Sequence, residues 1–328
     1  MPLNSLFCIP LPPASSDPAD HYRTHFDSLA RKILLDYDLY IGDKRYDILE
    51  VEMYLNTSEL GHEDPHCHNH PLQKTFSNWY FHRIGKTDGF KGGSRKGVDI
   101  TMGNPDNDTK GGMIIRAIKE QETDRLVEGP SLVVDEILQV HGHTSLKAFV
   151  SEKWKDKPAN CWATDTCLYL VKKENQDTSM QAPAKRRKLD RPLLMGTIYA
   201  SCRVGLRTWK ANTPYDKCLW FVGIPYRYVQ QPWLLKKGRI WTVLEMLDKN
   251  MAEKDIASLN NISINLVKKY KEAYEKGQSA PLEALRHIMT KDILSDSLWR
   301  IEAMSAIRWW GRQNEKGRAQ AISHIPIR

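Results

Sequence analysis

The sequence predicts an α+β protein, with one mixed domain that is followed by an all-helical extension. Up to about residue 235, short alternating apolar runs are separated by Gly-, Asn- and Asp-rich turns, which is typical of strands. Beyond that point apolar residues recur only at helical spacing, down to about residue 312. A length of 328 residues with 41% hydrophobic content allows a large buried core.

The expected elements follow in order along the chain. Residues 1–21 are rich in Pro and Ser, so we expect them to be flexible. From residue 25 a helix leads into a hairpin over residues 39–55, whose two alternating runs flank the turn Gly-Asp-Lys. EGPSLVVDEILQV has helical spacing after a Gly-Pro start. Further strands are expected at SNWYFHRI, GVDITM, GGMIIRAI, CLYLV, GTIYASCRVGL and CLWFVGI.

We therefore place the mixed domain at residues 22–235 and the helical extension at residues 236–328. Residues 173–191 are polar and without periodicity, which predicts a disordered basic insert. Its basic run has the form read by nuclear import receptors, although a solvated charge run is the alternative. The run consists of Lys185, Arg186, Arg187 and Lys188. We expect a nuclear protein that has an import receptor as a partner.

Charge and cysteine usage narrow the class of protein. The formal charge of +8 and pI near 9.0 suggest a polyanionic partner. No run of about 18 apolar residues predicts a membrane span. The six cysteines form no C-x-x-C pair, so we expect reduced thiols and no paired-knuckle zinc site. We expect a monomer.

The stretch from Glu50 to His70 changes from a strand pattern to a histidine-rich loop. Alternate histidines in this loop have workable spacing for zinc, but no second paired motif completes a tetrahedral site. The other interpretation begins with Glu52 and Tyr54, which point to one face of a strand. A carboxylate beside a phenol can polarise a water while the ring stacks on a flat substrate. Both interpretations remain open on spacing alone.

The order of motifs resembles the alkyladenine DNA glycosylase family. LARKILLDYDLYIGDKRYDILEVEMYL is similar to that family's opening helix, hairpin and E-x-E-x-Y strand. The similarity continues through NWYFHR, VDITMG, GGMIIRAIKE, EGPSLVVDEIL, CRVGLR and LWFVGIPYRYV, roughly from Ser28 to Val229. The resemblance implies a single α+β domain with a curved antiparallel sheet. It also implies a monofunctional DNA glycosylase that flips a modified base and hydrolyses its N-glycosidic bond, without cofactor or metal.

The resemblance also implies roles for particular residues. Glu52 corresponds to the general base that activates water, and Arg116 to the arginine that organises it. Tyr54 corresponds to the aromatic residue that stacks on the flipped base. The family's stacking histidine falls on Glu63, so His62 or His66 is expected to replace it.

Two departures concern the predicted base pocket. The family's pocket asparagine is Asp99, which offers only acceptors when ionised. A second pocket aromatic is replaced by His82, with Tyr80 on the same face. These changes keep open a runner-up function, a catalytically silent reader of modified bases in DNA.

The loop over residues 83–98 is the expected contact with double-stranded DNA, although a flexible basic loop is the plain alternative. It is rich in glycine and in cations that neutralise phosphates. Phe90 is expected at its tip, as a wedge for the gap left by a flipped base. The expected DNA-binding residues are Arg83, Lys86, Phe90, Lys91, Arg95 and Lys96.

The helical extension contains a pattern typical of a helix-turn-helix. A short helix over residues 252–259 is followed by Asn260 and Asn261, which tolerate a left-handed turn, and by Ser263 as the cap of a second helix. A plain helical bundle has the same pattern. The resembling family lacks this extension.

Overall fold

The computed structural model describes residues 5–13, 17–58, 61–174, 196–208, 210–280 and 296–315. The chain forms two compact units. Unit 1 comprises Met1–Ile198 and Tyr226–Gln231, and unit 2 comprises Tyr199–Pro225 and Pro232–Arg328. The predicted boundary at residue 235 is therefore wrong for residues 199–225, which belong to the largely helical unit. The basic run at residues 185–188 and the rest of its insert from residue 175 lie outside the described residues.

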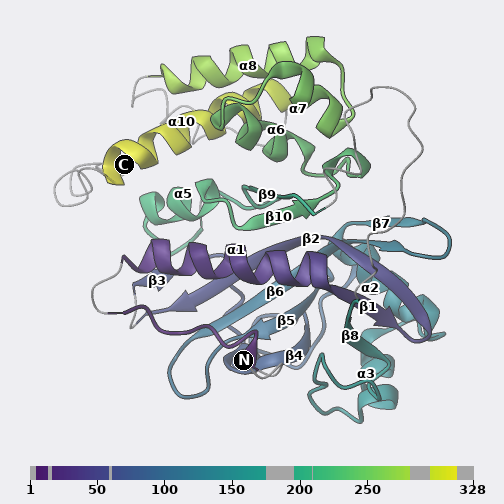
Figure 1. Ribbon diagram of the computed structural model, residues 1–328. Helices are drawn as coiled ribbons and strands as arrows, with labels where there is room; N and C mark the ends of the chain where they lie inside the picture. Colours follow the sequence, from purple (N-terminus) through teal and green to yellow (C-terminus); the bar gives the residue numbers. More distant parts are fainter. Residues whose placement is uncertain are drawn as a thin grey trace. The chain divides into compact units, whose positions relative to one another are not determined.

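Unit 1 is built on a curled antiparallel sheet, which confirms the α+β class (Figure 1). The main strand order is β4-β5-β6-β2-β1-β8, while β3 and β10 pair with β2 and β7 pairs with β6. The strands are β1 (Tyr37–Ile41), β2 (Lys44–Thr57), β3 (His62–Glu63), β4 (Phe76–Phe81), β5 (Val98–Met102), β6 (Lys110–Glu120), β7 (Leu126–Glu128), β8 (Leu168–Lys172) and β10 (Arg227–Gln230). The long strands β2 and β6 pair over most of their length and form the centre of the sheet.

Helix α1 (Pro18–Asp36) contacts β1, β2 and β10 along one face of the sheet (Figure 1). Its start is specified locally, because the Asp17 side chain accepts a hydrogen bond from the Ala19 backbone and Pro18 occupies the first turn. Its apolar stripe is buried, which stabilises the helix against the sheet. The buried residues are Tyr22, Phe26, Leu29, Ala30, Ile33 and Leu34.

The N-terminal segment is ordered where the structure describes it, contrary to the expected flexibility of residues 1–21. Helix α1 begins at Pro18, ahead of the predicted start. Phe7 is 0% exposed, and its ring lies 5.6 Å from that of Trp162. A buried aromatic side chain contributes about 1.5–3 kcal/mol of burial free energy, which holds this segment against unit 1.

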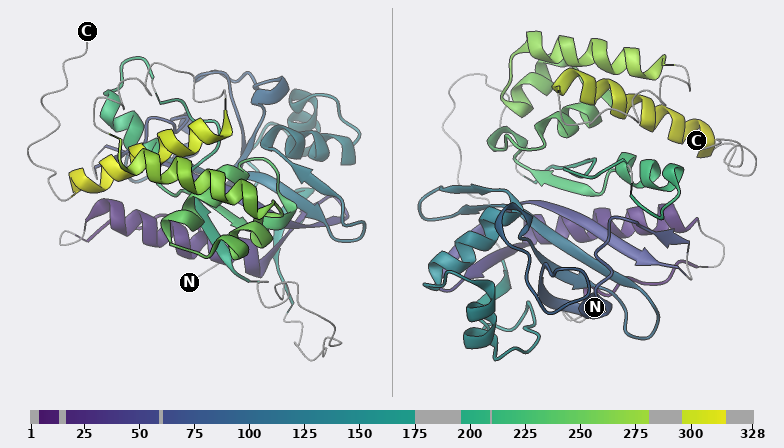
Figure 2. Two further views of the ribbon diagram at one scale, coloured as in Figure 1. Left: turned by 90° about the horizontal axis from the view of Figure 1, so that it is seen from above. Right: turned by 180° about the vertical axis from the view of Figure 1, so that it is seen from behind.

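Two further helices, α2 (Pro130–Val140) and α3 (Leu146–Trp154), complete unit 1, together with the short turns η2 (Pro71–Lys74) and η3 (Gly93–Arg95). Helix α2 contacts β5, β6 and β7, and Figure 2 shows α2 and α3 in teal in the view from behind. The Tyr46 hydroxyl donates to Glu136 of α2 over 2.6 Å. This contact ties the start of β2 to α2.

Unit 2 contains α5 (Tyr215–Gly223), the turn η4 (Pro232–Leu234), α6 (Arg239–Asp248), α7 (Glu253–Asn260), α8 (Ile264–Gln278) and α10 (Ser297–Glu315), and β9 (Ile198–Ser201) runs into it. The predicted strand CLWFVGI is wrong, because Tyr215–Gly223 is helical. Short apolar runs do not distinguish a buried strand from a buried helix.

The two helices of the helix-turn-helix pattern are confirmed. Asn261 has φ 52°, and the Ser263 side chain accepts from the Leu266 backbone at the start of α8. Helix α8 also packs closely on α10, since a Cβ at Gly277 would lie 2.2 Å from the Glu302 carbonyl oxygen. Among the described helices, none is both long and apolar enough to cross a membrane.

Candidate functional site

A row of side chains crosses the sheet of unit 1. Glu52 of β2 lies opposite Arg227 of β10 on one side and Ile114 of β6 on the other. Ile114 in turn lies opposite Asp99 of β5, and Asp99 lies opposite Tyr80 of β4. Residues paired directly across neighbouring strands point to the same face, so this row brings Glu52, Asp99 and Tyr80 to one side of the sheet.

Glu52 is the centre of a buried network of charges. The Tyr54 hydroxyl donates to Glu52 Oε2 over 2.7 Å, and Arg116 Nη1 donates to the same oxygen over 3.3 Å. Arg116 Nε also donates to Glu50 Oε1 over 2.8 Å, and Arg227 Nε donates to that oxygen over 2.6 Å. Two carboxylates therefore face two guanidinium groups, and each charge has an opposite partner.

The network shifts the pKa of Glu50 and of Arg116 in the directions that keep these two groups charged. Burial alone would raise the pKa of Glu50, but Arg227 and Arg116 outweigh burial and lower it. Burial alone would lower the pKa of Arg116, but Glu52 and Glu50 raise it. Glu52 is 0% exposed and Arg116 is 8% exposed, so these charges act in a largely dry environment.

Asp99 is held at both of its carboxylate oxygens. Its Oδ1 lies 2.8 Å from His82 Nε2, and its Oδ2 accepts from Gln73 Nε2 over 3.2 Å. Two glycines leave room for this pair, because a Cβ at Gly97 would lie 2.4 Å from His82 Cε1 and one at Gly112 would lie 2.7 Å from Asp99 Oδ2. The arrangement fixes an acceptor group on the same face as Glu52.

Two histidines of the loop lie against this end of the row. The His68 ring is 4.1 Å from the His82 ring, and the His70 ring is 5.4 Å from the Tyr80 ring. Lys91 Nζ lies 2.8 Å from His68 Nε2. Burial, followed by the Asp99 carboxylate, raises the pKa of Tyr80.

Three residues of the predicted base pocket, Tyr80, His82 and Asp99, lie together in the structure. The predicted loop histidine His62 does not join them. His62 lies on the α1 side, where its Nε2 is 2.9 Å from the Tyr226 hydroxyl and its ring is 4.8 Å from that of Tyr22. The His66 backbone N–H donates to Asp64 Oδ1 over 2.9 Å. His68 and His70 lie beside Tyr80 and His82, where His62 or His66 was expected. In the sequence, only their i, i+2 spacing could have indicated that these two histidines lie together.

Gln73 and Glu50 also belong to this site, and sequence reasoning missed both. Gln73 is 1% exposed, and its side-chain oxygen accepts from the His70 backbone over 3.3 Å while its amide donates to Asp99. No spacing rule connects positions 73 and 99, so only the tertiary structure reveals this pair. Glu50 has the same alternation signal as Glu52, two residues away on β2.

Asp99, His82 and His68 could hold a metal ion. Each residue offers one ligand atom, and these three atoms lie within 4.8 Å of one another. Two imidazoles and a carboxylate suit zinc and related transition-metal ions. The Glu52 network is less suitable for a cation, because Arg116 and Arg227 already neutralise its carboxylates.

Some cations of the basic loop are exposed to solvent, whereas others contact neighbouring side chains. Lys86 and Arg95 are exposed, whereas Lys96 pairs with Asp135 of α2. The Arg83 guanidinium lies over the Phe90 ring, 3.7 Å from its centroid. Phe90 therefore does not project from the loop as expected, and the exposed apolar side chain there is Ile84, at 56%.

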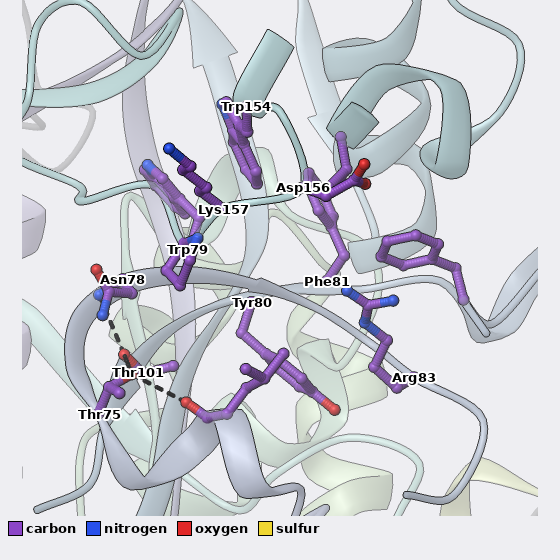
Figure 3. A pocket seen from close by; sticks show the side chains of 14 residues that line it. Thr75, Asn78, Trp79, Tyr80, Phe81, Arg83, Thr101, Trp154, Asp156 and Lys157 are labelled. Atoms are coloured by element: carbon purple, nitrogen blue, oxygen red, sulfur yellow. Dashed lines mark hydrogen bonds between the residues drawn. The ribbon is translucent and has the colours of Figure 1, made fainter. Parts of the chain in front are cut away.

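A cavity of about 80 Å³ lies along the edge strand β4 (Figure 3). Aromatic side chains from β4 and α3 form much of its wall, and the Phe81 and Trp154 rings stack at 5.3 Å. Arg83, Asp156 and Lys157 supply charge at its margin. Tyr80 is the member of the cross-strand row that lines it, whereas Glu52 and Asp99 do not.

Among known proteins, the chain has sequence similarity to a viral protein. A search of family models and a search of solved structures each found no match. The chain is 27% identical over 224 residues to "Uncharacterized protein L759" of Acanthamoeba polyphaga mimivirus. The matched region covers 65% of this chain and 89% of the viral protein, so the similarity extends over nearly the whole of that relative.

Proposed function

We propose that the protein is a DNA glycosylase that flips a modified base out of the duplex and hydrolyses its N-glycosidic bond, using the Glu52 carboxylate as general base. The observation that carries the proposal is the row in which Glu52 and Asp99 flank Ile114 on one sheet face. The two carboxylates are two strand spacings apart, about 9.5 Å between their backbones. That spacing suits a nucleoside with its sugar at Glu52 and its base edge at Asp99.

Each residue near Glu52 has a role in this reaction. Glu52 would accept a proton from the water that attacks the anomeric carbon as the base leaves. Tyr54 and Arg116 hold its Oε2, which leaves Oε1 turned toward Arg116 Nε at 3.3 Å. A base fixed by two donors keeps its orientation through the reaction, which lowers the cost of reorganisation.

At the other end of the row, the contacts of Asp99 determine which base is accepted. Its carboxylate offers acceptor positions, so it favours a base that carries an exocyclic amino group. Tyr80 and His82 flank Asp99 with aromatic rings, which suit the flat faces of a base. The glycosylase-like fold implied by the motif order is part of the same proposal.

The burial of Glu52 favours a second candidate function, a reader that binds a modified base without cleaving it. A carboxylate that is 0% exposed and paired with Arg116 is also what a structural ion pair requires. In the glycosylase, the segments that cover Glu52 must open to admit a nucleotide and water. In the reader, only the Asp99 end of the row meets the base.

One experiment distinguishes the glycosylase from the reader. Purified protein is incubated with duplex oligonucleotides that each contain one modified base, and released bases are identified by mass spectrometry. The glycosylase releases at least one base, and Glu52→Gln abolishes release while keeping DNA affinity within a few-fold. Asp47→Asn is the matched control, because it makes the same change on β2 at a carboxylate that accepts from Gln121 and Lys173 and not from Arg116 or Tyr54. Binding without release identifies the reader, and neither binding nor release refutes both.

A further inference from the structure

We propose that His68, His82 and Asp99 form a binding site for a divalent transition-metal ion of the zinc or cobalt type. This site does not depend on the proposed function, because the hydrolysis assigned to Glu52 requires no ion. The sequence left a zinc interpretation open for the histidine loop alone, whereas this site draws two of its three donors from outside that loop. The three donors come from separate segments: the histidine loop, the residue after β4, and β5.

The distances between the donors are close to those of a loaded site. His82 Nε2 and Asp99 Oδ1 are 2.8 Å apart, and the three candidate ligand atoms lie within 4.8 Å of one another. With metal–ligand bonds of about 2.0–2.1 Å, donors of a tetrahedral ion are about 3.3 Å apart. Small side-chain rotations can therefore bring these atoms onto one ion, once the His82 proton moves from Nε2 to Nδ1 or is released to solvent.

The surroundings orient the donors in the way that metal ligands are oriented. Gln73 occupies Asp99 Oδ2, which leaves Oδ1 directed at His82. The Gln73 side-chain oxygen accepts from the His70 backbone N–H, and the backbone carbonyl oxygen of Gln73 would lie 2.0 Å from a Cβ at Gly103, so both the side chain and the backbone of Gln73 are held in place. Such outer hydrogen bonds set the direction of a ligand and raise metal affinity.

Two glycines, Gly97 and Gly112, allow His82 and Asp99 to lie close to the neighbouring backbone. Any side chain at Gly97 would overlap the His82 ring, and any side chain at Gly112 would overlap the Asp99 carboxylate. Glycine weakens a strand, so its presence here favours a close approach that a packed side chain would prevent. Asp99 is 3% exposed, and the His82 side chain is 12% exposed, so both donors are directed inward.

The contact between Lys91 and His68 indicates that this cluster attracts positive charge. Its Nζ lies 2.8 Å from His68 Nε2, and because an ammonium only donates, this nitrogen presents a lone pair. A bound ion replaces the ammonium, which can withdraw because its side chain is long and flexible. The three protein donors then leave at least one coordination position for water or for a substrate atom.

Metal binding is tested on the protein alone, without DNA. The full-length chain is stripped with a chelator, dialysed and titrated with Co²⁺, and binding is followed by visible absorption and by competition between Zn²⁺ and a chromophoric chelator. One equivalent is expected per chain, with a rise in Tm on loading. His68→Asn, His82→Asn and Asp99→Asn should each weaken binding by about 100-fold or more, and Gln73→Ala by about tenfold.

Two further variants test the site without changing a proposed ligand, so they remain informative if a ligand variant fails to fold. Lys91→Met removes the competing charge and should tighten binding by about tenfold. His143→Asn removes a histidine that lies 3.7 Å from Glu152 on α3, so it controls for adventitious binding and should change nothing. Absence of stoichiometric binding overturns the proposal. So does binding that is unaffected by Lys91→Met and Gln73→Ala, or binding that is lost in His143→Asn.

Discussion

Glu52 and Asp99 lie opposite the same residue, Ile114, from the two strands that flank β6. This register places both carboxylates on one face of the sheet, with one apolar side chain between them. Their surroundings differ, because Glu52 is held by Arg116 and Tyr54 whereas Asp99 is held by His82 and Gln73. Two carboxylates in different environments can perform different tasks within one site.

Asp99→Asn should change which base is released rather than how fast the bond breaks. The amide offers a donor where the carboxylate offers only acceptors, so bases with carbonyl edges, such as hypoxanthine, should gain relative to bases with an amino group. A mismatched polar contact costs about 1–3 kcal/mol in a dry pocket, which predicts a roughly ten- to hundred-fold change in preference. Single-turnover excision of one lesion of each kind, in chelator, measures the ratio. Equal loss on both lesions would assign Asp99 to the catalytic apparatus or the fold.

Arg116→Met should destabilise the protein by about 3–5 kcal/mol, because it leaves two buried carboxylates with fewer partners. Glu50 keeps Arg227, so the larger part of the cost should come from Glu52. Urea unfolding measures the change in the free energy of unfolding. In a Glu52→Gln background the same substitution should cost less. Arg23→Met is the control, since the exposed Arg23–Asp20 pair should contribute less than about 1 kcal/mol.

Replacement of Lys86 and Arg95 by Ala should weaken DNA binding at every sequence and reduce the salt dependence of the binding constant. Both cations are exposed, so each can neutralise a phosphate, and the slope should fall by about one per lost contact. Lys96→Ala is the matched control, because Lys96 already pairs with Asp135. Fluorescence anisotropy over a range of salt concentrations gives the slope. An unchanged slope in the double variant would place the DNA on another surface.

The stability of the protein should fall as the pH decreases from about 6.5 toward 4. Burial, with smaller effects of His21 and Lys32, lowers the pKa of His25 from 6.5 to about 4, and its Nε2 is buried without a hydrogen-bond partner among the described residues. In that range the unfolded state binds the proton and the folded state does not, so stability rises with pH and is lost as the pH falls.

His25→Asn should remove about 1 kcal/mol of this pH dependence, after allowance for the partial exposure of the side chain. Unfolding free energies at several pH values between 4 and 7 measure it. Thr24→Ala, at an exposed position of the same helix, should keep the pH dependence of the wild type. A His25→Asn variant with the wild-type slope would show that other groups cause the effect.

Replacement of Lys185, Arg186, Arg187 and Lys188 by Ala should abolish nuclear accumulation of a fluorescent fusion of the full chain. The four cations form the kind of motif that import receptors read. Microscopy measures the ratio of nuclear to cytoplasmic fluorescence. Substitution of the nearby Lys172 and Lys173 is the control for loss of charge alone. Nuclear accumulation of the four-fold variant would contradict the assignment.

The sequence by itself determined the elements whose pattern is periodic and whose ends carry local signals. The β1–β2 hairpin, α2 after its Gly-Pro start, the α7–α8 pair and the part of α1 from residue 25 follow from spacing and caps, because those interactions are local. The common face of Glu52 and Tyr54 follows from the period of a strand. The run at Tyr215–Gly223 did not follow, because a short apolar run does not distinguish a strand from a helix.

Only the tertiary structure decided which residues from distant segments meet. The pairing of β2 with β6 and of β6 with β5 places Asp99 beside Glu52, and no local pattern encodes a strand order. The same is true of the loop, where Asn69 has φ 54° and breaks the simple alternation expected of an extended segment. His68 and His70 thus reach Tyr80 while His62 packs against α1, because the choice among neighbouring histidines depends on long-range packing and not on their spacing.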